Sequence, residues 1–287
     1  MKLLDKIIVK IFKLGAKKYW NIKENHLNKL PNIPSFAVPI AKYTTELQMK
    51  EISKKFEPEI QDELLFYGKH HFELEDLQTG DHIGNFCQFI KETERLEGNI
   101  LELGTYKGGS TVMLARFLKK INSKRKIFAC DAFLGYPYED KFSTQKNAKG
   151  TISDTSFEDV LKKFKKFNVD DKITIVKGLF EETLEKKLSN EKFSLVLIDC
   201  DLYDSVKFCL KFTYPRIVDD GLLIFDNYSL IGNKAEEKIK NLSDRNTSNL
   251  SEIFPDETAW GEVKAVDEFC SEEKIKLDLK PMPHIKK

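Results

Sequence analysis

The sequence lacks long apolar runs and has no excess of either charge. No stretch approaches the roughly 20 consecutive apolar residues that a transmembrane helix needs, so we expect no membrane-spanning segment. The 47 basic and 46 acidic residues leave a net charge of +1. This balance gives no reason to expect nucleic acid or another polyanion as a partner. The 287 residues suffice for one large domain, or for one domain with an appendage.

Cysteine is scarce, and the five cysteines show no C-x-x-C spacing. An odd number without paired spacing is typical of reduced thiols, so we expect a cytoplasmic protein without disulfides. A secretion signal is also lacking, because Asp5 and Lys6 interrupt the apolar residues of 1–14 and no small-residue cleavage site follows. This segment instead predicts an amphipathic helix that docks on its own domain or on a second copy in a homodimer. Contact with a membrane surface is the less favoured alternative.

Several common motifs of enzymes are absent. No H-E-x-x-H spacing occurs, which argues against a zinc hydrolase, and no G-x-S-x-G elbow occurs, which argues against a serine hydrolase. A dinucleotide-binding G-x-G-x-x-G loop would need glycine where the chain has Tyr106. A Walker A loop would need lysine where the chain has Ser110.

A glycine-rich loop nevertheless follows the short apolar segment 99–103 and leads into residues with helical spacing. Strand, glycine turn and helix form the architecture of nucleotide-type cofactor loops, since glycine lets the backbone approach the ligand and the helix N-terminus offers free N–H groups. The remaining pattern is E-x-G-x-x-x-G, from Glu102, Gly104 and Gly108. It suits a cofactor without a pyrophosphate, such as S-adenosylmethionine.

A second apolar strand ends at Asp131, about one βαβ unit after the loop. An acid at the end of the second strand commonly accepts hydrogen bonds from ribose hydroxyls. An aspartate that simply starts a turn is the equally favoured alternative.

Four acidic or amide side chains follow two later apolar runs. The run 193–198 stops at Asp199 and Asp201, and the run 221–225 stops at Asp226 and Asn227. Taken singly, each pair is explained by the tendency of Asp and Asn to start turns. Ligands of open α/β sheets bind beyond the carboxyl ends of the strands. Two neighbouring strands that both end in oxygen ligands therefore predict a hard-cation site, with Mg²⁺ the first candidate.

From Gly80 onward, expected strands and helices alternate, which indicates an α/β fold with a mostly parallel sheet and helices on both faces. Asp219 and Asp220 are expected in a turn that enters the last of these strands. Residues 1–75 show no strand pattern and predict a helical cap or oligomerisation segment. The expected strands are 99–103, 126–131, 172–176, 193–199 and 221–226, and the expected helices are 81–95, 109–120, 155–167, 181–188, 203–213 and 261–272.

Several blocks of the sequence resemble one known family, the macrocin O-methyltransferases. The resemblance implies a Rossmann-like, class I, metal-dependent S-adenosylmethionine methyltransferase that modifies sugar hydroxyls of natural products, with 76–287 as the methyltransferase domain. The strand-end pattern also resembles catechol-type and caffeoyl-CoA-type O-methyltransferases, in which Asp, Asp and Asn hold Mg²⁺. The matching blocks are 79–84, 98–110, 131–137, 177–184, 198–205, 214–216, 221–228 and 264–269.

The resemblance also implies roles for individual residues. Asp199, Asp226 and Asn227 would be the ligands of Mg²⁺, and Asp201 would be the general base that takes a proton from the acceptor hydroxyl. The acceptor would be a sugar or another small molecule with vicinal hydroxyls. The residues expected to bind S-adenosylmethionine are Glu102, Gly104, Thr105, Gly108 and Ser110 near the methionine part, Asp131 at the ribose, and Gly178 and Phe180 at the adenine.

The chain departs from the family pattern at three places. Asn227 stands where the family usually has an acid, and an amide carbonyl still binds Mg²⁺ with one negative charge fewer. A long polar stretch lies between Tyr228 and Trp260, where a substrate lid would be. The C-terminus lacks an aromatic final strand, so we expect a shortened end of the sheet.

Two other functions remain open from the sequence. One is an NAD-dependent sugar oxidoreductase, which Tyr106 in the glycine loop disfavours. The other is a non-catalytic nucleotide-binding protein of the same fold, which the presence of all four strand-end residues disfavours.

Overall fold

The structure, a computed structural model, describes residues 37–140, 142, 149–228 and 260–287. Its internal contacts divide the chain into two units, Met1–Glu73 and Leu74–Lys287. The amphipathic helix expected at 1–14 and the whole polar stretch between Tyr228 and Trp260 lie outside the described residues. The roles of the two units as cap and catalytic domain stay predictions.

The described part of the first unit consists of helix α2 (Ala37–Ser53) and most of helix α3 (Pro58–Leu74). The two helices pack closely at Gly68, because a Cβ added there would lie 2.8 Å from the Met49 side chain. Pro58 begins α3, a position where the missing N–H costs no helical hydrogen bond. The described residues of this unit contain no strand, in agreement with the sequence pattern.

The second unit is built on a six-stranded sheet with the order β3-β2-β1-β4-β5-β6. Neighbouring strands from β3 to β5 pair in parallel, and β6 alone pairs antiparallel to β5. Every residue of β4 is buried, as expected for a strand covered on both faces. The bounds are β1 Asn99–Leu103, β2 Ile127–Asp131, β3 Ile173–Lys177, β4 Phe193–Ile198, β5 Ile217–Phe225 and β6 His284–Lys286.

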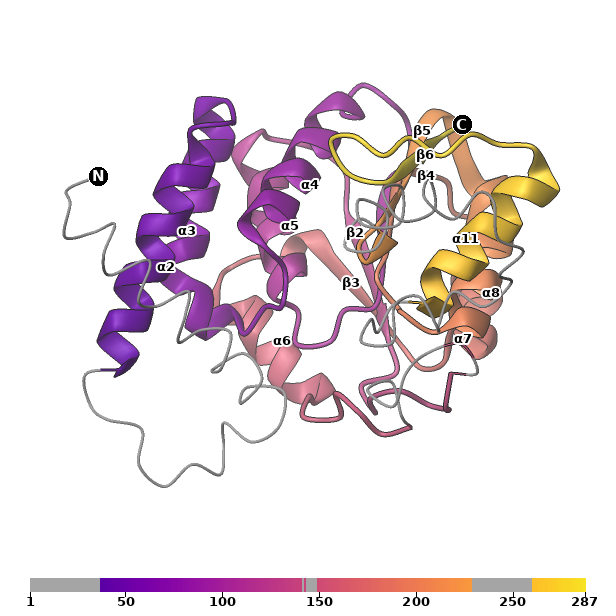
Figure 1. The fold of residues 1–287 in the computed structure, drawn as a ribbon, viewed down its shortest axis with the longest axis horizontal. Helices are drawn as coiled ribbons and strands as arrows, with labels where there is room; N and C mark the ends of the chain where they lie inside the picture. Colours follow the sequence, from indigo (N-terminus) through magenta and orange to yellow (C-terminus); the bar gives the residue numbers. More distant parts are fainter. Residues whose placement is uncertain (1–36, 141, 143–148, 229–259) are drawn as a thin grey trace, which may run out of the picture. The chain divides into compact units, whose positions relative to one another are not determined.

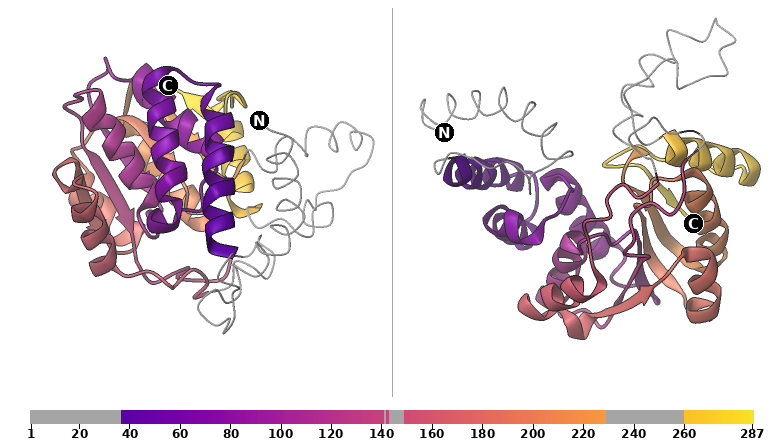
Figure 2. Two further views of the ribbon diagram at one scale, coloured as in Figure 1. Left: turned by 90° about the vertical axis from the view of Figure 1, so that its left-hand side faces the viewer. Right: turned by 90° about the horizontal axis from the view of Figure 1, so that it is seen from below.

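Helices cover both faces of this sheet. Helices α4, α5 and α6 lie on one face, and α7, α8 and α11 lie on the other (Figures 1 and 2). The predicted fold class, a mostly parallel Rossmann-like α/β sheet between two helical layers, is confirmed. The bounds are α4 Gly80–Glu92, α5 Gly109–Lys120, α6 Phe157–Lys166, α7 Phe180–Leu188, α8 Tyr203–Thr213 and α11 Trp260–Glu273.

The prediction for Asp219 and Asp220 is wrong, because both residues lie inside β5 rather than in a turn before it. The pairing of β4 with β5 shifts in register between Phe193 and Leu195, and Asp220 has a φ of +65°. A β-bulge of this kind accommodates a left-handed residue within the strand. The sequence Asp-Asp-Gly is typical of such a bulge as well as of a turn.

The far edge of the sheet is short. Strand β6 has three residues, in agreement with the shortened end expected from the C-terminal sequence. None of the helices in the described ranges is long and apolar enough to cross a membrane.

Candidate active site

The carboxyl ends of three central strands meet at one edge of the sheet. In the register of these strands Leu103 pairs with Ile198, and Ile198 pairs with Phe225. The ladder continues one step further, because the N–H of Asp199 donates to the Leu103 carbonyl at 2.9 Å and the N–H of Asp226 donates to the Ile198 carbonyl at 3.2 Å. The sheet therefore brings the two predicted ligand-bearing strand ends next to each other, beside the glycine loop.

Gly104 makes this close approach possible. It has a φ of +106°, and a Cβ added there would lie 1.8 Å from the carbonyl oxygen of Asp199. Any side chain would therefore collide with the backbone of the neighbouring strand end. Glycine at this position is explained by the contact between β1 and β4.

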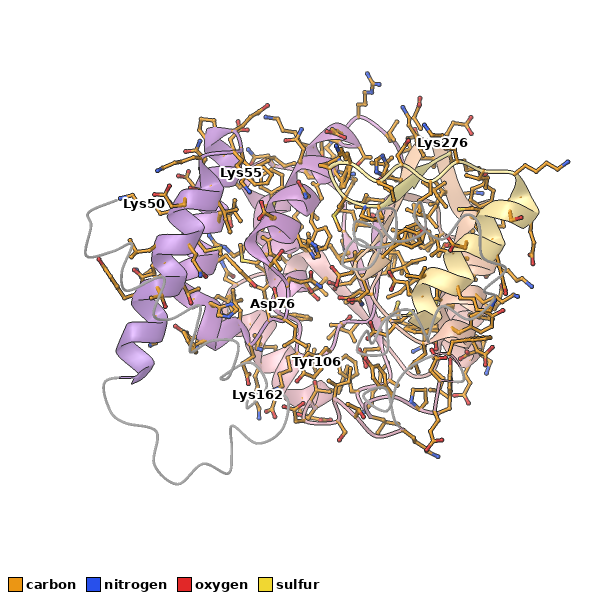
Figure 3. All side chains as sticks on the ribbon, viewed as in Figure 1. Lys50, Lys55, Asp76, Tyr106, Lys162 and Lys276 are labelled. Atoms are coloured by element: carbon orange, nitrogen blue, oxygen red, sulfur yellow. The ribbon has the colours of Figure 1, made fainter. Side chains whose placement is uncertain are left out.

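The rest of the glycine loop is held by Asp131 at the end of β2. One carboxylate oxygen accepts the N–H of Tyr106 at 2.8 Å, and the other accepts the N–H of Phe133 at 2.6 Å. Burial raises the pKa of Asp131, although these backbone hydrogen bonds oppose the shift. The loop ends at Gly108, which caps α5 in a left-handed conformation with φ +76°. Tyr106, a residue of this loop, is labelled in Figure 3.

Glu102 and Ser110, two of the predicted cofactor residues, are hydrogen-bonded to each other. The buried carboxylate of Glu102 accepts hydrogen bonds from the hydroxyls of Ser110, at 2.7 Å, and of Thr111. Burial raises the pKa of Glu102 to about 7. This contact ties β1 to the first turn of α5. A direct contact of Glu102 or Ser110 with a cofactor stays a prediction, as it does for the buried Thr105.

The two residues predicted to border an adenine follow β3. Gly178 has a φ of +132°, and its N–H donates to the Asp131 carbonyl at 3.0 Å. Phe180 begins α7 and packs, partly buried, against the core of the unit. The sheet order therefore aligns the predicted adenine, ribose and methionine residues along one edge, in the direction of Asp199. Their roles stay predictions.

An acidic cluster lies at the ends of β4 and β5. Asp199 and Asp201 are half-buried, whereas Asp226 and Glu262 are buried. Burial, together with the charges of Asp226 and Asp201, raises the pKa of Asp199 well above its usual range. Burial likewise raises the pKa of Asp201 to about 6. Negative charges held close together raise the pKa of carboxyl groups, because the ionised forms repel each other. The cluster therefore favours the binding of a cation or of protons.

Asp201 is held by two neighbours. Its carboxylate accepts hydrogen bonds from the hydroxyl of Tyr136 and from the amide nitrogen of Asn227. The backbone of Asp201 is left-handed, with φ +57°, which turns the residue away from the strand direction. The side chain of Asn227 thus faces the predicted base, and its role as a metal ligand stays a prediction. Tyr136 lies in the family-like block 131–137 but was given no role, because a tyrosine in a loop carries no signal of its long-range partner.

Glu262, in the first turn of α11, is a second residue that sequence reasoning missed. One of its carboxylate oxygens accepts the N–H groups of Asn227 and Tyr228, each at 3.1 Å. The other oxygen is buried and has no hydrogen-bond partner among the described residues. Burial and the charges of Asp201 and Asp226 raise the pKa of Glu262 well above its usual range.

Two further polar side chains contact the strand-end acids from the start of α4. Gln78 donates from its amide nitrogen to Asp199 at 2.9 Å, and Nδ1 of His82 lies 2.8 Å from a carboxylate oxygen of Asp226. Burial lowers the pKa of His82, but the hydrogen bond and the charge of Asp226 outweigh it, so that the pKa is raised. Neither residue was predicted as part of the site.

The chemical types in the cluster suit Mg²⁺, which prefers carboxylate and amide oxygens. One oxygen of Glu262 has no partner among the described residues, and the crowding that raises the pKa of Asp199 would be relieved by a cation. Within the described ranges, however, no three side chains of His, Cys, Asp or Glu are arranged to hold a metal ion. The residues therefore fit the ion by type and charge, and a coordination geometry is not observed.

The fold is that of a class I Rossmann-like methyltransferase, and solved O-methyltransferases share it. The solved O-methyltransferase NovP superposes with a TM-score of 0.57 at 17% identity, covering 86% of this chain and 99% of that one. The calicheamicin methyltransferase CalS11 superposes with a TM-score of 0.58 at 15% identity, covering 91% of this chain and 96% of that one. At these identities the similarity establishes the fold.

The chain belongs to the macrocin-O-methyltransferase (TylF) family, whose pattern matches residues 81–261. The resemblance noted in the sequence is therefore confirmed. A Streptomyces olivaceus protein, 8-demethyl-8-(2,3-dimethoxy-alpha-L-rhamnosyl)-tetracenomycin-C 4'-O-methyltransferase, is 24% identical over 154 residues, which are 50% of this chain and 58% of that protein. Demethyldecarbamoylnovobiocin O-methyltransferase of Streptomyces niveus is 24% identical over 156 residues, which are 51% and 59%. The chain thus matches less than two thirds of the length of these relatives.

Proposed function

We propose that this protein transfers a methyl group from S-adenosylmethionine to a hydroxyl of a sugar or another vicinal diol, with the help of Mg²⁺. The observation that carries the proposal is the meeting of Gly104, Asp199 and Asp226 at one edge of the sheet. Membership of the macrocin-O-methyltransferase family supports it. The name of the Streptomyces olivaceus relative, which includes a rhamnosyl group, supports a sugar-containing acceptor.

The methyl donor would bind along the ends of β1, β2 and β3. Asp131 keeps both carboxylate oxygens near the glycine loop, where a carboxylate would accept hydrogen bonds from the ribose hydroxyls. Gly104 and Gly108 would allow the methionine part to approach the backbone at the start of α5. Gly178 and Phe180 would border the adenine.

Asp201 would act as the general base. Its pKa of about 6 leaves it largely ionised near neutral pH, with enough basicity to accept a proton from a hydroxyl. As the acceptor oxygen bonds to the methyl carbon, the carbon–sulfur bond breaks with its electrons moving to sulfur, and the hydroxyl proton moves to Asp201. Tyr136 and Asn227 would hold the carboxylate in a fixed direction for this transfer.

Asp199, Asp226 and Asn227 would hold the Mg²⁺ ion. When bound, the ion supplies positive charge that lowers the pKa of the acceptor hydroxyl and compensates the acidic cluster. A vicinal diol suits such a site because two oxygens of one acceptor can reach the same cation. The buried Glu262, which accepts the N–H of Asn227, would keep the end of β5 in place.

The test is to denature freshly purified protein and identify the released small molecules by mass spectrometry, followed by calorimetric titration with S-adenosylhomocysteine. Release or binding of S-adenosylmethionine or S-adenosylhomocysteine supports the transferase. A nicotinamide dinucleotide would support the oxidoreductase instead. Failure of the intact protein to bind either sulfur compound would overturn the proposal and favour a non-catalytic protein of this fold.

A further inference from the structure

Gln78 and His82 form a polar bridge between the two strand ends. Gln78 lies just before Thr79, the N-cap of α4, and His82 lies in the first turn of the helix. Gln78 contacts Asp199 after β4, and His82 contacts Asp226 after β5. The two side chains also contact each other, with the Gln78 oxygen 3.0 Å from Nδ1 of His82.

The hydrogen bonds of this bridge run in one consistent direction. Both partners of Nδ1 in His82 are oxygens, the Gln78 carbonyl and the Asp226 carboxylate, so Nδ1 carries the hydrogen in either charge state of the ring. The Gln78 oxygen faces this donor, which turns its amide nitrogen towards the Asp199 carboxylate. Each carboxylate therefore receives one donor, Asp199 from Gln78 and Asp226 from His82.

The bridge is shielded from solvent and anchored to the backbone. Gln78 is 9% exposed, and the side chains of His82 and Asp226 are 12% and 9% exposed. The hydroxyl of Thr79 accepts the N–H of His82 at 3.2 Å, and Asp76 accepts the N–H of Gln78 at 3.2 Å. These hydrogen bonds fix the first turn of α4, which carries His82, and the segment just before it, which carries Gln78. Hydrogen bonds from fixed donors to carboxylates are among the stronger ones in proteins.

The physical need for such a bridge follows from the charges. Asp199 and Asp226 follow neighbouring parallel strands, so two ionised carboxylates at these positions would repel each other and turn apart. One fixed donor on each carboxylate opposes this tendency and limits the rotamers that the pair can adopt. Second partners of this kind commonly orient the side chains that bind a metal.

We propose that Gln78 and His82 are positioning residues that preorganise Asp199 and Asp226 for a divalent ion. The inference rests on the proposed metal-dependent function. Neither residue needs to touch the ion or the substrates, because each acts through the carboxylate that it holds.

The test compares Mn²⁺ affinity among full-length variants, measured by electron paramagnetic resonance of free Mn²⁺ with S-adenosylhomocysteine present. His82→Phe keeps a ring but removes the donor, and we expect it to weaken Mn²⁺ binding about 10- to 100-fold. His82→Asn returns an N–H close to the position of Nδ1 and should restore affinity to within about threefold of wild type. Gln78→Met should weaken Mn²⁺ binding by a similar factor.

The matched control is Gln88→Met, which removes a half-buried glutamine of α4 that hydrogen-bonds to Glu92. It should leave Mn²⁺ affinity unchanged. Affinity for S-adenosylhomocysteine, measured on the same samples, should stay within about twofold in all variants and so reports correct folding. If His82→Phe does not fold, Gln78→Met and His82→Asn still test the bridge.

The outcomes separate this inference from the proposed function. Wild-type protein that binds Mn²⁺, with variants that bind it equally well, would overturn the bridge and leave the metal proposal intact. Wild-type protein that binds S-adenosylhomocysteine but no Mn²⁺ would overturn both. Loss of Mn²⁺ affinity in His82→Phe and Gln78→Met, with recovery in His82→Asn, supports the bridge.

Discussion

Replacing Gly104 with alanine tests whether the contact between β1 and β4 determines the site. The residue has a φ of +106°, and a left-handed conformation costs a residue with a Cβ roughly 1–2 kcal/mol. The added Cβ would also lie 1.8 Å from the Asp199 carbonyl oxygen, which is backbone and cannot swing aside. Separating two packed strands adds about 1–3 kcal/mol, as other overpacked cores do. We therefore expect Gly104→Ala to lower the free energy of unfolding by about 2–5 kcal/mol.

Gly150→Ala is the matched control, because Gly150 has a φ of +81° and a Cβ added there would meet no atom within 4 Å. Gly150→Ala should lower the free energy of unfolding only by the cost of the left-handed backbone, about 1–2 kcal/mol. Urea denaturation followed by circular dichroism gives both free energies of unfolding. Titration of folded Gly104→Ala should also show weaker binding of S-adenosylhomocysteine, since the loop and Asp199 must move apart. Equal stabilities of the two variants, with unchanged binding, would refute the steric argument.

Three further variants test separate parts of the account. Asp199→Ala should lower the methyl-transfer rate more than about 100-fold and abolish its response to Mg²⁺, with S-adenosylhomocysteine still bound, in assays with and without chelator. Asp201→Asn should keep Mn²⁺ binding but lose about 10²- to 10⁴-fold in kcat, because the proton acceptor is gone. In the wild type, the free energy of unfolding should fall as the pH rises from about 4.5 to 7, and Glu102→Gln should make this fall smaller. Urea denaturation at several pH values measures it.

The sign of the last effect follows from the raised pKa of Glu102. The folded chain keeps the proton up to about pH 7, whereas the unfolded chain releases it above its ordinary value of 4.5. The folded state binds more protons in this window, so stability falls as pH rises, by about 3 kcal/mol in total. Glutamine does not ionise and should remove this contribution. A pH profile of Glu102→Gln parallel to that of the wild type would contradict the assignment.

An unchanged methyl-transfer rate in Asp201→Asn would show that Asp201 is not the base. Full activity of Asp199→Ala in the presence of chelator would show that Asp199 is not a metal ligand.

The sheet could be predicted well from sequence because its signals are local. Apolar runs such as 193–198 are buried at every position, and the helices between the runs show a different spacing. The carboxyl ends of parallel strands share one edge, so Asp199 and Asp226 could be expected to meet. Glycine is needed at position 104 because β1 and β4, which are distant in sequence, come into contact there. The spacing of the glycines in the sequence does not reveal this contact.

The residues that surround the strand ends could not be predicted in this way. Gln78, His82, Tyr136 and Glu262 reach the cluster through contacts across 35 or more residues, and each looks like an ordinary polar residue in its own segment. No periodicity or spacing marks such a partner. The bulge in β5 was missed for a related reason, since Asp-Asp-Gly is typical of both a turn and a left-handed residue within a strand.

The central claim is that a divalent ion at the ends of β4 and β5 lies beside the sulfur end of the methyl donor. Nuclear magnetic resonance of bound S-adenosylhomocysteine, with Mn²⁺ in place of Mg²⁺, tests it without knowledge of the acceptor. The sheet order puts β1 next to β4 and β3 three strands away, at about 4.8 Å per strand, and paramagnetic relaxation falls steeply with distance. The homocysteine protons should therefore relax much faster than the adenine protons, and Asp199→Ala should abolish the effect. Equal relaxation of both groups at saturating Mn²⁺, or none in either, would contradict the account.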